Sequence, residues 1–510
     1  MLKKRILFIL LALVLAISIS LIGCGGGTGE QQEEEEEEEE EEGPTSIMIG
    51  TVRDLDEDQF IFDCYHGGPA MRWFVDKVND EDGGIYLSEY SKTVPLELVV
   101  RDFSLASWDL ATVAQGLIDD GANVLFGGPS TDSIYTLAPV ANQNGVIILT
   151  LEGGASKIVW EHENYIDNWP YVWINLSFAN WYEIPVLKGM MDEAVTERDP
   201  IAYVTYIGGL GAEHGLEYKD TTIDEFGAAN VLPSGGIQHS FMMTQEEADT
   251  IIQGAMTALG DPANPNYDIF CAFTYPWNVA SLFGAIQAFG FNPPAMIFGP
   301  GSSQGYFPVT WGDETIEGIL SFGTSNAKTT VKVGTPTISM ADLYDEIGAQ
   351  IEDDWENYTS VCPNIFGAAH GTDVLDFWGQ PIFEAGLSMW KEAVEEVGDL
   401  DNTAIRNAMA SFTPSNPAST CFGDTWYRVF GFDPITGAPN RAGGGIVDYL
   451  CQTGQIGQWQ SGIFEITGFD GIDTTNWAVD PLGGDPAPLS NYDTTSDFMF
   501  PMTDQWAWLS

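Results

Sequence analysis

Basic residues are scarce in this sequence, and so are histidine and cysteine. The 510 residues include 18 Lys and Arg against 75 Asp and Glu, which gives a formal net charge of −57. Such a surface repels phosphate backbones, and no basic patch offers an exception, so we expect no binding to DNA or RNA. The five His and six Cys form no His-x-His, His-Glu-x-x-His or Cys-x-x-Cys spacing. A zinc site therefore has no support, and we expect no metal or other cofactor.

Apolar residues, in contrast, are plentiful. Hydrophobic residues make up 44% of the chain and aromatic residues 12%, which is enough for a substantial core. The length predicts two lobes or more, at about 150 residues per domain.

The N-terminus has the pattern of an export signal. Lys3, Lys4 and Arg5 precede an apolar run over residues 6–22. The run ends in Leu21-Ile22-Gly23-Cys24, which resembles the bacterial lipobox, whose Cys is lipidated and becomes the new N-terminus. We expect residues 1–23 to be a signal peptide and Cys24 to anchor the protein on the outer side of the cell membrane. A retained membrane helix is the alternative, although the run is marginal in length for one.

Residues 24–46 are predicted to form a tether after the lipidated cysteine. Ten consecutive Glu at residues 33–42 repel one another and stay solvated, so we expect a disordered spacer rather than a metal or partner site. These ten account for only a small part of the excess of acidic residues. The body of the protein therefore carries most of the negative charge.

Export would place the other five cysteines in a compartment where disulfides form. An odd number leaves at least one unpaired. We expect Cys421 to pair with Cys451 or Cys362, because all three lie in the loop-rich C-terminal part. Cys271 lies in an apolar strand pattern and is expected to be a buried thiol, and Cys64 has no assigned partner.

From residue 47 the chain alternates strand and helix patterns, and it does so twice. The first series has strand patterns at 47–52, 96–100, 124–126 and 146–149, and the second at 201–206, 269–273 and 295–298. Helical spacing lies between them, for example at 131–143, and again at 382–397. The alternation predicts an α/β fold with two doubly wound parallel-sheet lobes.

Ligands of such sheets bind beyond the carboxyl ends of the strands. This rule selects the loops at residues 53–58, 103–108, 127–132, 150–156, 207–214, 274–277 and 299–303. Arg53 is a candidate partner for a carboxylate, and Tyr275 with Trp277 would suit a flat apolar or aromatic ligand. The alternative for the two aromatic residues is packing at the edge of a lobe.

At these loops the sequence resembles the branched-chain amino-acid type of periplasmic substrate-binding protein, the type I receptor of an ABC importer. The resemblance rests on the order of short matches at Ile49-Gly50, Val78-Asn79, Gly83-Gly84-Ile85, Gly127-Gly128-Pro129-Ser130-Thr131, Ala138-Pro139, Phe298-Gly299-Pro300 and Glu317-Gly318. It implies two lobes, joined by a three-crossover hinge, that close on a small polar or aromatic organic solute and deliver it to an ABC permease. We expect a monomer.

The resemblance also implies which residues contact the ligand. The loop at Ser130 and Thr131 would hold the ligand's carboxylate, although both residues could instead only cap the following helix. The segment from Thr150 would add contacts from Glu152 and Gly154, and Tyr275 would be the aromatic contact of the second lobe. The acid that holds an amino acid's ammonium group in the family falls at Gly301. This departure counts against an α-amino-acid ligand, unless Glu152 replaces that acid.

The expected lobe boundaries follow the same scheme. Lobe 1 would comprise residues 47–172 and about 302–405, and lobe 2 residues 173–301 and about 406–470. Residues 471–510 would form a C-terminal tail that packs on the hinge or on the lobes.

Two other functions stay open. One is a ligand-sensing receptor of the same fold, and the other is a secreted serine hydrolase. For the hydrolase, Gly301-Ser302-Ser303-Gln304-Gly305 matches the Gly-x-Ser-x-Gly elbow around Ser303. The elbow requires a following helix, yet residues 306–308 read as a loop, and His370 is the only later histidine. We therefore expect no enzyme.

A calcium loop is also disfavoured. Asp54, Asp56 and Asp58 begin like an EF-hand loop, but Gln59 and Tyr65 stand where that loop requires Gly and Glu. We expect a solvated loop at these residues.

Overall fold

A computed structural model gives the fold. It describes residues 43–53, 67–103, 107, 109–127, 131–150, 169–176, 201–207, 215–216, 219–220, 222–224, 227–228, 231–240, 243–259, 269–291, 293, 295–322, 325–331, 334–356, 371–429, 443–447, 451, 456–468 and 496–497.

The first sheet has seven strands in the order β15-β16-β7-β6-β5-β1-β4. Neighbouring strands are parallel except β15, which is antiparallel to β16. The strands are β1 (Ile47–Arg53), β4 (Leu96–Asp102), β5 (Val124–Phe126), β6 (Ile147–Thr150), β7 (Val172–Ile174), β15 (Tyr427–Val429) and β16 (Gly445–Val447).

The second sheet has eight strands in the order β19-β18-β17-β12-β11-β10-β8-β9. Its five strands from β9 to β12 are parallel, β17 is antiparallel to both of its neighbours, and β19 is parallel to β18. The strands are β8 (Ile201–Ile207), β9 (Val231–Ser240), β10 (Ile269–Thr274), β11 (Met296–Pro300), β12 (Leu320–Phe322), β17 (Ile456–Gln460), β18 (Ile463–Gly468) and β19 (Ser496–Asp497).

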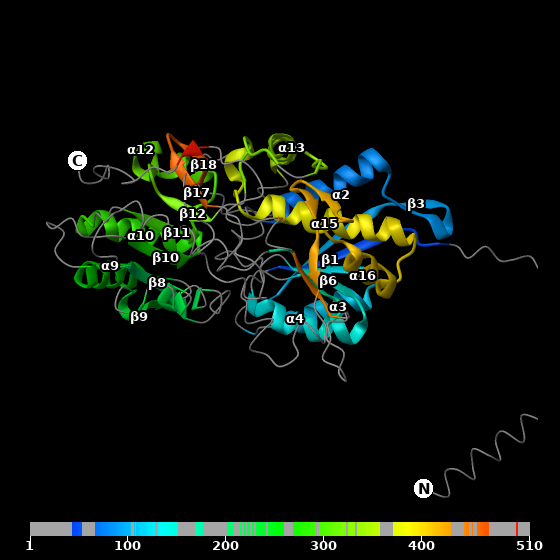
Figure 1. Ribbon diagram of the computed structural model, residues 1–510, viewed down its shortest axis with the longest axis horizontal. Helices are drawn as coiled ribbons and strands as arrows, with labels where there is room; N and C mark the ends of the chain where they lie inside the picture. The colour runs from blue at the N-terminus through cyan, green and yellow to red at the C-terminus, as the bar shows by residue number, and fades with distance from the viewer. Residues whose placement is uncertain are drawn as a thin grey trace, which may run out of the picture. The chain divides into compact units, whose positions relative to one another are not determined.

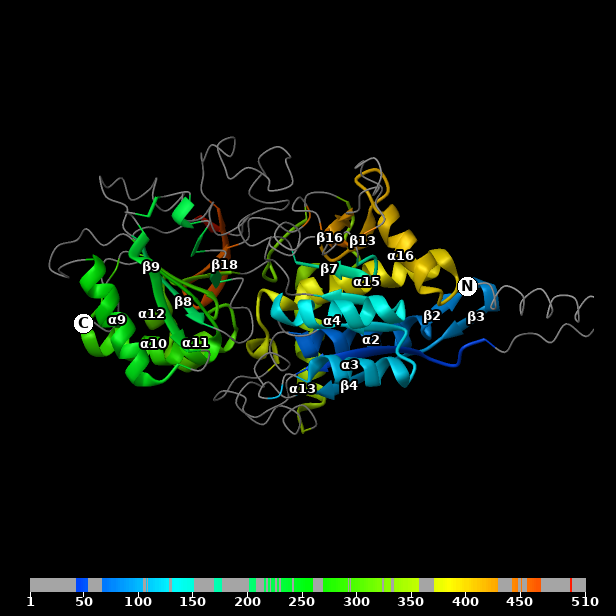
Figure 2. The ribbon, with the colours of Figure 1, turned by 90° about the horizontal axis from the view of Figure 1, so that it is seen from below.

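Helices accompany both sheets. With the first sheet lie α2 (Gly68–Asp82), α3 (Leu110–Asp119), α4 (Thr131–Asn144), α13 (Met340–Asp353), α15 (Gly379–Val397) and α16 (Asn402–Ser411). With the second lie α9 (Gln245–Leu259), α10 (Pro276–Phe289), α11 (Tyr306–Trp311) and α12 (Asp313–Ile316), and Figure 2 shows α9 and α10 side by side. Smaller elements are the β2 (Ile85–Leu87) and β3 (Lys92–Val94) hairpin, the β13 (Ala418–Thr420) and β14 (Gly423–Thr425) hairpin, and the 3-10 turns η2 (Ser88–Tyr90) and η4 (Gly371–Val374).

Helices cover both faces of the first sheet, and successive side chains of a strand point to opposite faces. On β5, Val124 and Phe126 join the core cluster of α2 and α15, whereas Leu125 joins the cluster of α3 and α4. Strands that are buried on both faces read as continuous apolar runs, as this one does. Figure 1 shows α2 and α15 on one side of β1 and β6, and α3 and α4 on the other.

Three connections pass between the sheets: from β7 to β8, from β12 to α13, and from β16 to β17. Helix α13 returns the chain to the first sheet's helices, since Glu346 on α13 accepts hydrogen bonds from Trp73 at 3.1 Å and Lys77 at 2.8 Å on α2. The structure therefore confirms two doubly wound α/β lobes with a three-crossover hinge.

Sheet membership departs from the expected lobe boundaries at two places. Strand β12 belongs to the second sheet, whereas residues from 302 onward were assigned to lobe 1. Strands β15 and β16 belong to the first sheet, although residues 406–470 were assigned to lobe 2. We therefore propose that the second and third changes of lobe fall after residue 322 and after residue 447.

Two local expectations are wrong. The segment that begins at Tyr306 is helical (α11), because Pro308 lies in the first turn, where a helix tolerates the missing N–H. Cys421 is a buried free thiol that donates to the carbonyl oxygen of Pro381 at 3.2 Å, so neither expected disulfide forms. Cys271 is buried in β10, as expected.

Candidate functional site

The order of the parallel strands singles out one point in each sheet. The first sheet runs β4-β1-β5-β6-β7 and the second runs β9-β8-β10-β11-β12. In both sheets the first of these strands along the chain lies inside the sheet, the second pairs on one side of it, and the later strands follow on the other side. Open α/β sheets bind ligands beyond the carboxyl ends of the strands at this switch point. The switch points lie between β1 and β5 and between β8 and β10.

The pairing register of the strands places the predicted ligand-binding residues of the first sheet, where the structure describes them, at one edge. Thr51 is opposite Phe126, and Phe126 is opposite Leu149. Arg53 and Thr150 therefore end β1 and β6 at the same edge, and Thr131 begins α4 just beyond the end of β5. In the second sheet, Tyr275 follows the last residue of β10, and Trp277 is the second residue of α10.

Arg53 lies at this edge and is 2% exposed. The carbon centre of its guanidinium lies 5.2 Å from the ring centroid of Phe383 on α15, and Nη2 donates to Sδ of Met71 at 3.5 Å. The Phe383 ring in turn stacks on Phe126 with centroids 5.1 Å apart. The end of β1 thus carries a buried positive charge that is held over an aromatic face.

Hydroxyl groups without partners lie at strand ends in both sheets. Thr150 ends β6 and Thr274 ends β10, and each is completely buried. Within the described ranges, neither Oγ1 atom has a hydrogen-bond partner, and the same holds for Thr51 on β1. Leaving a buried hydroxyl unpaired costs about 1–3 kcal/mol. These atoms therefore mark places where the polar group of a ligand or a water would complete a hydrogen bond.

Tyr275 caps the N-terminal end of α10 through its backbone. Its carbonyl oxygen accepts the N–H groups of Asn278 at 3.0 Å and Val279 at 3.2 Å. The side chain is 3% exposed, and its ring lies edge-on to Phe273 with centroids 6.3 Å apart. In this structure the ring packs at the end of β10 and shows little surface.

Gly301 has no room for a side chain. A Cβ atom there would lie 2.6 Å from the carbonyl oxygen of Thr274 and 2.6 Å from Cγ2 of Val279. The close approach of residue 301 to the β10–α10 turn therefore requires glycine. The acidic side chain that the family carries at the matching position would not fit here.

Several candidates lie outside the described residues: Ser130, Glu152, Gly154 and Cys24. Sequence reasoning selected the loop that begins at Thr274 but did not assign a role to that residue. The signal was its place as the last residue of an apolar strand, which is also what selected Thr150.

The serine proposed for a hydrolase is not accessible. Ser303 is completely buried, and its carbonyl oxygen accepts the N–H of Phe377 at 3.0 Å. The neighbouring Ser302 hydroxyl donates to the carbonyl oxygens of Phe298 and Leu320. A nucleophile must present its oxygen to a substrate, which Ser303 does not do here.

The described residues contain neither a membrane-spanning helix nor a metal-binding cluster. No helix among them is both long and apolar enough to cross a membrane. No group of three or more His, Cys, Asp or Glu side chains in the same part of the chain is arranged to hold a metal ion.

Comparison with known proteins identifies the fold. No family model and no curated protein matches the sequence. Among solved structures, a solute-binding protein of an ABC transporter from R. palustris, in complex with 4-hydroxybenzoate, is 15% identical with a TM-score of 0.54, and the match covers 81% of this chain and 92% of the other. A leucine-binding protein from Thermotoga maritima is 13% identical with a TM-score of 0.54, covering 82% and 97%.

A third solved structure is the branched-chain amino acid transporter substrate-binding protein from Streptococcus pneumoniae in complex with isoleucine. It is 12% identical with a TM-score of 0.51, and the match covers 82% of this chain and 97% of the other. At these identities the likeness concerns the fold. The chain has the fold of type I periplasmic solute-binding proteins, as the sequence resemblance implied.

Proposed function

We propose that this protein is an extracytoplasmic solute-binding lipoprotein. It captures a small polar or aromatic organic solute between its two lobes and delivers it to an ABC importer. The observation that carries the proposal is the pair of matching switch points. Arg53 and Thr274 lie at the strand ends beside them and Thr150 ends the next strand, β6, so a buried charge and hydroxyls without a partner among the described residues gather at these ends. Capture of this kind involves no covalent step.

The site favours a carboxylate with an apolar or aromatic body. The ligands of two similar solved structures, 4-hydroxybenzoate and isoleucine, share a carboxylate group. Arg53 supplies a cation that can attract such a group. The packing at Gly301 leaves no acid to pair with an ammonium group at that position. Of the two ligand types, the aromatic acid therefore fits this chain better.

Closure of the lobes would couple binding to delivery. A ligand shifts the open and closed populations only by the difference in its affinity for the two states. Lipidation at Cys24 would keep the receptor at the membrane, beside its permease. A Cys24→Ser variant is expected to leave the membrane fraction for the soluble fraction of fractionated cells, and its retention in the membrane would contradict the anchor.

The ligand class can be tested with the purified mature protein. We would measure the melting temperature in the presence of aromatic acids, short-chain carboxylates, amides and amino acids, because a ligand that binds only the native state raises it. Aromatic acids are expected to raise it more than leucine or isoleucine. Tight leucine binding would contradict the inference from Gly301.

A further inference from the structure

A second concave site lies apart from the strand ends described above. A cavity of about 300 Å³ is lined by residues of α11 and the turn before it, of the crossover after β12, of α13, of η4 and the segment that follows it, and of the β17–β18 hairpin. Its volume is at the lower end of the range for small-molecule sites. None of Arg53, Thr150 and Tyr275 lines it.

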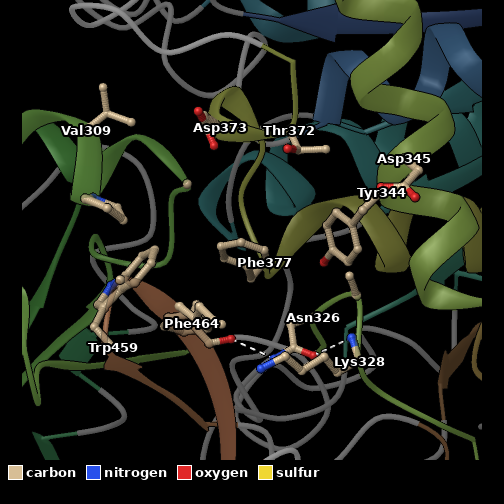
Figure 3. Close-up of a pocket in the computed structure, with 15 residues that line it drawn as sticks. Val309, Asn326, Lys328, Tyr344, Asp345, Thr372, Asp373, Phe377, Trp459 and Phe464 are labelled. Atoms are coloured by element: carbon tan, nitrogen blue, oxygen red, sulfur yellow. Dashed lines mark hydrogen bonds between the residues drawn. The ribbon is translucent and has the colours of Figure 1, made fainter. Parts of the chain in front are cut away.

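One wall of the cavity is aromatic, as Figure 3 shows. The ring of Phe377 lies at the centre of this wall, with its centroid 5.5 Å from that of Tyr344, 5.2 Å from that of Phe464 and 6.1 Å from that of Trp459. Trp459 and Phe464 are 5.2 Å apart. Four rings from three parts of the chain thus form one packed cluster, in which Phe377 is half-buried and Tyr344, Trp459 and Phe464 are buried.

Hydrogen bonds fix this wall in place. Nε1 of Trp459 donates to the carbonyl oxygen of Ser302 at 2.7 Å, and the N–H of Phe377 donates to that of Ser303 at 3.0 Å. In the same cluster, Nδ2 of Asn326 donates to the carbonyl oxygen of Phe464 at 2.8 Å. The aromatic wall is therefore preorganised, so a ligand would not have to order it.

The charges around the cavity favour a cation. Among the described residues of the lining, Lys328 is the only basic one, and its ammonium group forms an ion pair with the carboxylate of Glu465. Two exposed acidic residues, Asp345 and Asp373, also belong to the lining. Within the described part of the chain, Asp345 makes no hydrogen bond or ion pair, so its charge is not offset.

Two exposed apolar side chains also belong to the lining of the cavity. Val309 is 43% exposed and Ile463 is 45% exposed, and both line the cavity. Large hydrophobic side chains with this much exposure are few among the described residues. Two of them in one lining indicate a surface that an apolar group could cover.

We propose that this cavity binds a small organic cation with an apolar body, of the alkylammonium or quaternary ammonium class. Aromatic faces attract such cations, and they do so more strongly where water is displaced. The carboxylate of Asp345 adds attraction for the positive charge, and Val309 and Ile463 contact the alkyl groups. This site is separate from the solute site at the strand ends, and the proposal does not depend on that function.

Choline and its uncharged isostere 3,3-dimethylbutan-1-ol test the proposal. The two probes have nearly the same shape and differ in charge. Titration calorimetry of the purified mature protein is expected to show choline binding about tenfold or more tighter than the alcohol, a ratio that corresponds to about 1.4 kcal/mol. Equal binding of the two, or no binding of choline, would overturn the proposal.

Matched variants locate the binding. Asp345→Asn is expected to weaken choline binding about fivefold to tenfold, whereas Asp353→Asn, an equally exposed charge change on the same helix, should leave it within about twofold. Phe377→Leu is expected to weaken choline binding more than Asp345→Asn does. Phe289→Leu, at an exposed ring on α10, serves as its control. Choline binding that Asp345→Asn does not change would place the cation elsewhere and refute the assignment.

Discussion

Thr150 and Thr274 end central strands of the two sheets, and both hydroxyls are buried without a hydrogen-bond partner among the residues that the structure describes. If each hydroxyl bonds the solute, replacing it by the isosteric valine removes one hydrogen bond, which is worth about 0.5–1.5 kcal/mol. We expect Thr150→Val and Thr274→Val each to weaken solute binding up to about tenfold in calorimetric titration.

The sign of the stability change in the same two variants can also be predicted. Valine removes a polar group whose burial is uncompensated in the unliganded protein, so the free energy of unfolding should stay equal or rise. Thr93→Val, at an exposed threonine of β3, is a control for the substitution itself. Variants that lose stability while keeping full affinity would show that the hydroxyls serve packing rather than ligand binding.

Gly301→Ala should destabilise the protein. The added methyl group would lie 2.6 Å from a backbone oxygen of Thr274, which cannot rotate away as a side-chain end can. Overpacking of this kind costs about 1–3 kcal/mol, which urea unfolding would measure. Gly284→Ala within α10 is the control, because its nearest neighbour is the flexible Gln245 side chain and alanine favours the helix. Equal stability of the two variants would contradict the packing account of the missing acid.

Tyr427 ties the late strand β15 to the end of β7. Its hydroxyl donates to Oδ1 of Asn175 at 2.5 Å, and burial raises the pKa of this tyrosine far above its usual value. Tyr427→Phe leaves the buried Asn175 oxygen unpaired and is expected to lower the free energy of unfolding by about 1–3 kcal/mol. Tyr86→Phe, at a ring that is 50% exposed, should change it little. A similar small effect at both sites would contradict the role of this hydrogen bond.

The raised pKa of Glu392 predicts that the free energy of unfolding depends on pH. Burial raises its pKa, and Glu396 and Glu395 raise it further, while the N–H of Ser419, 3.0 Å away, opposes the shift. The folded state therefore holds the proton more tightly than the unfolded state. The contribution of this group to the free energy of unfolding is complete below the ordinary pKa of a glutamate and falls as pH rises through the raised pKa.

Glu392→Gln keeps an acceptor for Ser419 and removes the titration. Its free energy of unfolding should fall less than that of the parent protein when urea unfolding is repeated from about pH 4 to pH 7. The exposed Glu97→Gln is the charge-matched control. If the free energy of unfolding changed with pH in the same way in the parent protein and in Glu392→Gln, this carboxyl group would not be a source of the pH dependence.

The parallel strands were predictable because they are buried on both faces. The run at 124–126 gives β5 with unchanged bounds, and the strand expected at 269–273 is one residue short of β10. Strand β9 was not predicted, since Pro233, Gly235 and Gly236 lie in it and read as turn signals. The pairing of β16 with β7 joins residues far apart in sequence, and no local pattern records such a contact.

From the sequence, residues of the candidate site were predictable only where the order of strands and helices alone determines their position. The end of each parallel strand selects Arg53, Thr150 and the Thr274 turn without any knowledge of side-chain contacts. The surroundings of Arg53 were not predictable, because Phe383 and Met71 reach it from α15 and α2. The cavity beside Phe377 was missed for the same reason, since five separate segments form it.

The central claim is that the two lobes capture one small organic solute at these strand ends. Calorimetric titration of the mature protein with the best compound of the panel, in the parent and in the Thr150→Val, Thr274→Val double variant, tests it most directly. We predict one site per chain and an affinity about tenfold to a hundredfold lower in the double variant. An unchanged affinity in the double variant, or no binding of any panel compound to the parent, would contradict the claim.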